Sequence, residues 1–259
     1  MIDILIKILV CFFAGMGAGL GTGFAGMSAA AVISPVLITI LGVDAYAAVG
    51  IALASDVLAS GVSAYTYKKE NNLDVKNGII MMASVLVFTM VGSGVASLVP
   101  SHTMGGFSVV MTALLGVKFI VKPVMTTKEA MQQTSPQKRA VQSVIMGVII
   151  GFICGFIGAG GGMMMLLVLT SVLGYELKTA VGTSVFIMTF TALTGAVSHF
   201  ALGGMPDLLL LCLCVVFTLI WARIGARIAN KADPILLNRM TGVILIVLGI
   251  VISVFHWIG

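Results

Sequence analysis

GFIGAGGGMMM occupies residues 155–165 and lies inside a long apolar stretch of the chain. Five of these eleven residues are glycine, and each glycine weakens a helix by about 1 kcal/mol relative to alanine. The segment therefore predicts an interrupted helix. Glycine also frees the backbone and lets it approach a ligand closely.

The composition of the whole chain indicates a membrane protein. Of its 259 residues, 59% are hydrophobic and 9% are charged, and the mean hydropathy is +1.18. A soluble domain carries about 25% charged residues. The apolar runs are long, unlike the short alternating segments of a β-barrel, so we expect an all-α polytopic membrane protein. The net charge of +5 lies mostly in three loops, which is a topology signal and predicts no nucleic-acid partner.

Polar breaks divide the chain into apolar segments at residues 2–41, 45–66, 78–99, 104–122, 140–173, 177–200, 207–229 and 235–258. Six of these segments have the length of one membrane crossing, about 20 residues. The first and fifth segments are too long for one crossing and barely long enough for two, and both contain glycine clusters near the middle. We expect each of these two to be a hairpin of two short helices that turns near its glycines, which gives eight to ten membrane segments in all.

Lysine and arginine residues predict the orientation. The basic loops are residues 68–76, 118–139 and 223–239, and the positive-inside rule places all three in the cytoplasm. Each long segment must then enter and return on one side, residues 2–41 from outside and residues 140–173 from inside. This orientation places both termini outside the cell. No loop has a disulfide or glycosylation pattern, so we expect the plasma membrane of a prokaryote.

The two halves of the chain are related by an offset of 132 residues. GLGTGFAG (19–26) aligns with GFICGFIG (151–158), and GVDAYAAVG (42–50) aligns with GYELKTAVG (174–182). Because the first half begins outside and the second begins inside, we expect an inverted repeat, which is typical of secondary transporters. The alternative is the duplication of a hydrophobic unit that does not transport. The predicted units are a first repeat at 1–125, a cytoplasmic linker at 126–139 and a second repeat at 140–259.

The two glycine-rich breaks predict an anion site. Free N–H groups at the start of a half-helix are costly in lipid, but they carry the positive end of the helix dipole and can face a polar cavity. Two such breaks, one from each side, could surround one small anion. The alternative is close helix packing, and the spacing of Gly15, Gly19 and Gly23 fits it. The candidate substrate-binding residues are Thr22, Gly23, Gly26, Ser28, Gly158, Gly160, Gly161, Gly162, Thr183 and Ser184.

Asp56 lies in the middle of an apolar segment. A carboxylate inside a membrane costs several kcal/mol and marks a functional site by default. Burial disfavours the charged form, so Asp56 is the candidate proton carrier. Protonation would also remove its repulsion of an anion. The alternative is a structural carboxylate paired with hydroxyl groups or a cation.

At these residues the sequence resembles the TauE/SafE sulfite exporter family, also called the TSUP transporters. The family pattern is a GxxxGxxGxGGG stretch near the start of each half, followed by AVGTS. The second half carries GFICGFIGAGGG (151–162) and AVGTS (180–184). The first half carries the looser GLGTGFAGMSAA (19–30) and AVGIALAS (48–55). The resemblance implies transport of small, mostly sulfur-containing anions.

We therefore expect a secondary active transporter of sulfite, thiosulfate or an organosulfonate, coupled to protons, with alternating access around the two breaks. Its partners are then the anion, protons and the lipid bilayer, and a homo-oligomer is compatible with the sequence. The alternative is an uncoupled anion channel that uses the same helix ends. We expect no enzyme, no cofactor and no metal site, because the chain lacks HExxH, paired carboxylates on one helix, a phosphate-binding loop and metal-ligand spacing of its four cysteines.

Overall fold

The computed structural model describes residues 2–96, 114, 116–133, 135–157, 161–203 and 206–258, and every regular element in these ranges is a helix. Seven of the described helices are long and apolar enough to span a membrane. The predicted all-α polytopic membrane fold is therefore confirmed. Most of the predicted segment at 104–122 lies outside the described residues, and its last part is helical at residues 116–121.

The helices are α1 (Ile2–Ala25), α2 (Ala30–Leu41), α3 (Ala45–Lys69), α4 (Val75–Ala96), α6 (Lys128–Gln132), α7 (Pro136–Ile157), α8 (Gly161–Ser171), α9 (Leu177–Gly203), α10 (Leu208–Lys231) and α11 (Pro234–Ile258). The short helix α6 lies within the predicted linker between the halves.

The prediction that each glycine-rich hairpin consists of two short helices is wrong, because the first helix of each hairpin is long. Helices α1 and α7 have 24 and 22 residues. At 1.5 Å per residue they are about 33–36 Å long, enough to cross a hydrocarbon core of about 30 Å. Helices α2 and α8 have only 12 and 11 residues, which is about half that length. Each hairpin is therefore one long helix followed by a half-helix.

Helix packing explains why α1 continues through its glycines. A Cβ added at Gly15 would lie 2.7 Å from the Phe217 Cβ of α10, and one added at Gly19 would lie 2.6 Å from the carbonyl oxygen of Thr218. These glycines let α1 and α10 approach closely, as small residues four apart do in membranes. Of the two interpretations of this run of glycines, a ligand site or close helix packing, the structure supports close packing for Gly15 and Gly19.

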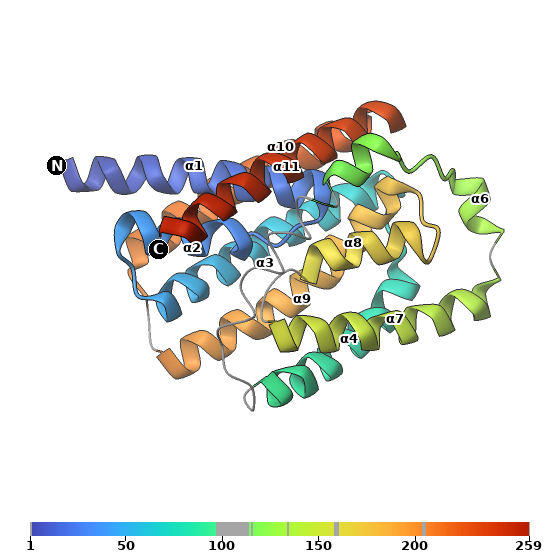
Figure 1. The fold of residues 1–259 in the computed structure, drawn as a ribbon, viewed down its shortest axis with the longest axis horizontal. Helices are drawn as coiled ribbons and strands as arrows, with labels where there is room; N and C mark the ends of the chain where they lie inside the picture. Colours follow the sequence, from blue (N-terminus) through green and yellow to red (C-terminus); the bar gives the residue numbers. More distant parts are fainter. Residues whose placement is uncertain are drawn as a thin grey trace.

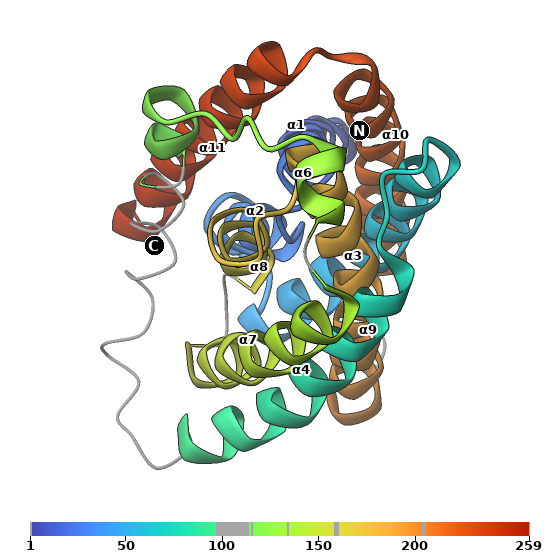
Figure 2. The same ribbon diagram turned by 90° about the vertical axis from the view of Figure 1, so that its right-hand side faces the viewer.

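The half-helices α2 and α8 lie end to end in the middle of the molecule. They reach the centre from opposite ends (Figure 1), and the longer helices surround them in the end-on view (Figure 2). Helix α1 packs along α10, α4 packs along α7, and α3 packs against both α9 and α10. The interior thus contains two helix ends that face each other inside a helical bundle.

The helices of the first half recur in the second half at the predicted offset. Adding 132 to the bounds of α1, α2, α3 and α4 gives those of α7, α8, α9 and α10 within three residues. The packing pairs also correspond, because α1 on α10 and α7 on α4 exchange under this shift.

The turns after the half-helices match as well. Gly42 and Gly174 have left-handed φ angles of 63° and 65°, which glycine adopts without strain. These matches support the repeat. Its inverted orientation in a bilayer and its boundaries at 1–125, 126–139 and 140–259 stay predictions.

Candidate functional site

The turn between α1 and α2 contacts the N-terminal end of α8. The chain leaves α1 and turns at Gly26, whose φ of +60° favours glycine. A Cβ added at Gly162, in the first turn of α8, would collide with the carbonyl oxygen of Gly26. The Ser184 hydroxyl of α9 lies 3.1 Å from the Gly26 carbonyl oxygen and 3.4 Å from that of Gly162. Because a hydroxyl has one proton, Ser184 donates to one break at a time and stands between them.

Asp56 of α3 lies at the N-terminal end of α2 and is only 1% exposed. The hydroxyl of Ser28 donates to its Oδ2 at 2.6 Å, and the hydroxyl of Ser60 donates to its Oδ1 at 2.7 Å. Ser28 lies two residues before Ala30, the first residue of α2, so the carboxylate is held beside the start of this half-helix. The protein therefore holds an anionic group of its own at the positive end of a half-helix. Ser60 was not among the predicted residues, although its position four residues after Asp56 places it on the same helix face.

Two other predicted residues, Thr22 and Gly23, lie in the last turn of α1, just before the turn at Gly26. The Thr22 hydroxyl donates within its own hairpin, and its Oγ1 lies 2.9 Å from the carbonyl oxygen of Met27. A Cβ added at Gly23 would lie 2.7 Å from the Ala222 carbonyl oxygen, and the Gly23 carbonyl oxygen accepts a hydrogen bond of 2.8 Å from Tyr67. Thr22 and Gly23 thus hold the turn and its packing on α10. A contact of either residue with substrate stays a prediction.

The second break is described from Gly161, the first residue of α8. Gly158 and Gly160 lie outside the described residues. Thr183 accepts a hydrogen bond of 3.2 Å from the backbone N–H of Asp74, so its hydroxyl links α9 to the loop before α4. Of the predicted site residues, the structure brings together those at the two half-helix ends: Gly26, Ser28, Asp56, Gly162 and Ser184.

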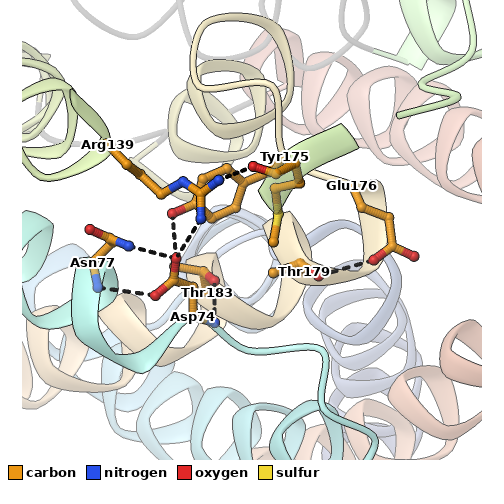
Figure 3. A network of polar contacts seen from close by, with 8 residues as sticks. Asp74, Asn77, Arg139, Tyr175, Glu176, Thr179 and Thr183 are labelled. Carbon is orange, nitrogen blue, oxygen red and sulfur yellow. Dashed lines mark hydrogen bonds and ion pairs between the residues drawn. The ribbon is translucent and has the colours of Figure 1, made fainter. Parts of the chain in front are cut away.

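A polar network at one end of the molecule adjoins this site through Thr183 (Figure 3). Its centre is Asp74, whose Oδ2 accepts hydrogen bonds from the Tyr175 hydroxyl at 2.8 Å and from the Asn77 side chain at 2.7 Å. The Nη1 of Arg139 lies 3.9 Å from the same oxygen. The guanidinium group also lies 5.5 Å from the ring centroid of Tyr175. The network joins the loops before α4 and α9 to the first turn of α7.

The ion pair of this network is largely buried, so the stability of the protein depends on both partners. The side chains of Arg139 and Asp74 are 11% and 15% exposed. Removing one partner of a buried pair leaves an uncompensated charge, which is strongly destabilising. Burial and the Asp74 carboxylate raise the pKa of Tyr175, so its hydroxyl stays protonated and donates. In the sequence Arg139 counted only as a loop charge, because no local pattern pairs it with Asp74.

A second ion pair joins Lys7 of α1 to Asp207, with 3.0 Å between Nζ and Oδ2. The offset of 132 residues carries Lys7 onto Arg139, and Asp207 lies one residue past the position that corresponds to Asp74. Each aspartate also accepts a backbone N–H from the first turn of the helix that follows it. The side chains of the Lys7 pair are 35% and 40% exposed, so the two pairs correspond in place but differ in burial.

Within the described ranges, no three histidine, cysteine, aspartate or glutamate side chains lie together as metal ligands do.

The comparisons with known proteins all concern membrane transport. A family model described as "Sulfite exporter TauE/SafE" matches residues 11–252. Two proteins of Bacillus subtilis (strain 168) are similar along most of their length. "Probable membrane transporter protein YdhB" is 23% identical over 85% of this chain and 89% of its own, and "Probable membrane transporter protein YunE" is 25% identical over 93% of each.

Proposed function

Since the chain belongs to the sulfite exporter TauE/SafE family and is a membrane transporter, we propose that it is a secondary active transporter of a small sulfur-containing anion, such as sulfite, thiosulfate or an organosulfonate. The observation that supports this proposal is that the turn leading into α2, at Gly26, and the first turn of α8, at Gly162, meet at Ser184 inside a membrane bundle. Such paired interruptions at the midplane are where secondary transporters bind their substrates.

The chemistry of the two helix ends suits an oxoanion. Each end supplies backbone N–H groups and the positive end of a helix dipole, which favours negative charge. Inside a membrane, such groups are tolerated where protein buries them or where they line a cavity. In the present conformation Gly162 lies against Gly26, so an anion would enter by separating the two breaks. That separation fits an alternating-access cycle in which the site opens to one side at a time.

Asp56 would couple this anion to a proton. As a carboxylate it accepts hydrogen bonds from the hydroxyl groups of Ser28 and Ser60 and places a negative charge at the α2 end. The two ion pairs of the described residues lie elsewhere, so no cation compensates that charge there. A substrate anion would meet repulsion and find the donors occupied. Protonation removes the charge and turns an acceptor oxygen into a donor, so the proton and the anion would be bound together.

Flux measurements in proteoliposomes test this proposal. We expect uphill uptake of sulfite or thiosulfate driven by an imposed proton gradient, in a panel that includes sulfate and sulfoacetate. Asp56→Asn should abolish the proton-driven accumulation. Asp44→Asn is the matched control, because Asp44 begins the same helix as an exposed cap and asparagine caps equally well.

The alternative of an uncoupled anion channel predicts a different result. A channel would give only downhill flux, which the proton gradient and Asp56→Asn would leave unchanged. Such flux in the wild-type protein would reject the secondary transporter.

A further inference from the structure

The two half-helix ends carry different residues at corresponding positions. The offset of 132 residues carries Asp56 onto Met188. Asp56 lies at the α2 end, bonded to Ser28. Met188 lies at the α8 end, because a Cβ added at Gly162 would lie 2.5 Å from its Sδ and 3.1 Å from its Cε. Met188 is 3% exposed, and the Ser184 Oγ lies 3.8 Å from its Sδ. One position therefore holds an acid in the first half and a thioether in the second.

The polar residues around the α2 end, which we call the polar cage, have no polar counterparts in the sequence of the second half. Ser28, Asp56 and Ser60 form the cage around the α2 end. Their counterparts at the same offset are Gly160, Met188 and Ala192, none of which has a hydroxyl or carboxyl group. A thioether carries no charge and is only a weak acceptor. The first half thus satisfies its helix end with an internal anion, and the second half has no side chain of that kind at this position.

We propose that Met188 is a specificity-determining residue, which rests on the proposed function. Its neutral and polarizable side chain keeps the α8 end free of internal negative charge, so that this end takes the transported anion. The carboxylate of Asp56 at the corresponding α2 end is an independent indication, because it is an anionic group already bound to a helix end of this kind in the same protein. The two breaks then have separate roles: α2 holds the titratable carboxylate, and α8 holds the substrate.

Three substitutions at one position test this inference. Met188→Leu and Met188→Asn keep the position neutral, and Met188→Asn has nearly the shape of Met188→Asp, so the flux of the aspartate variant is compared with that of the asparagine variant. Met188→Asp adds a carboxylate, and we expect flux to fall about a hundredfold, as for like charges roughly 5 Å apart in a protein interior. Flux that survives Met188→Asp in folded protein would overturn this inference alone. A wild-type protein that moves none of the panel anions would overturn the proposed function, and this inference with it.

A second arm adds the charge only after folding. Met188→Cys is made in a protein whose native cysteines, Cys11, Cys154, Cys212 and Cys214, are replaced by alanine. The folded protein is then treated with a sulfonate-bearing methanethiosulfonate reagent or with its neutral methyl analogue, and mass spectrometry measures the modification. We expect the sulfonate to abolish flux and the methyl group to leave at least half of it. Equal flux after the two modifications, or a thiol at position 188 that stays unlabelled during transport, would overturn the inference.

Discussion

Replacing Gly162 with alanine tests whether the contact between the two helix breaks matters for both stability and transport. A Cβ at this position would collide with the Gly26 carbonyl oxygen and would lie 2.5 Å from the Met188 Sδ. The methionine is flexible and would have to move by about 0.9 Å to restore an ordinary contact of about 3.4 Å. The carbonyl is held by the left-handed turn at Gly26 and by Ser184, so it cannot move as easily.

The expected cost follows from this geometry. Overpacking a well-packed interior costs about 1–3 kcal/mol. Alanine returns up to about 1 kcal/mol through its helix propensity, but less in the first turn, where Gly162 lies. We therefore expect Gly162→Ala to lower the free energy of unfolding by about 1–2 kcal/mol, which corresponds to a fall of roughly 2–8 °C in Tm. An alternating-access cycle needs the two breaks to close again after they separate, so a methyl group that keeps them apart should lower anion flux as well.

Gly61→Ala is the matched control for this prediction. A Cβ at Gly61 in α3 would meet only the Thr189 Cγ2, at an ordinary 3.7 Å. Alanine should therefore be neutral or slightly stabilising there, with normal flux. Thermal unfolding in detergent and flux in proteoliposomes would be measured for both variants. If Gly162→Ala matched Gly61→Ala in both assays, the contact between Gly162 of α8 and the turn at Gly26 would not exist in the working protein.

The remaining predictions concern the two ion pairs. Arg139→Ala and Asp74→Ala should each destabilise the protein by about 3 kcal/mol or more, and the double variant by less than their sum, because each single change leaves a buried charge unpaired. Lys7→Ala should lower the free energy of unfolding by at most about 1 kcal/mol, since the side chains of its ion pair are more than a third exposed. Equal losses of stability in Lys7→Ala and Arg139→Ala would refute this difference between the two ion pairs. The Lys7 ammonium group holds the pKa of Asp207 below its ordinary value of 3.8, so the stabilisation by Asp207 is present above about pH 3.8 and is lost as the pH falls through the lower folded value. Asp207→Asn keeps the helix cap and should flatten the acid side of a plot of Tm against pH, whereas an unchanged plot would contradict the assignment.

The sequence by itself determined the membrane class, the two glycine-rich stretches in which a break is expected and the offset of the repeat. These features are written in local composition, because 59% hydrophobic residues in long runs leave lipid as the only solvent for the outer surface. The glycine-rich stretches are equally local, since each glycine weakens a helix relative to alanine.

Only the tertiary structure decided which glycines break a helix and which pack one. Gly19 and Gly26 look alike in the sequence, but α10 approaches the first and leaves α1 continuous, whereas the second turns with a left-handed φ. The partners of Asp56 and the pairing of Arg139 with Asp74 were likewise not predicted. The contacts of Asp56 with Ser28 and of Arg139 with Asp74 join residues far apart in the chain, so their existence depends on which segments pack together, and no local pattern of hydrophobicity or charge records that. The contact of Asp56 with Ser60 is local, and its spacing of four residues could have been found in the sequence.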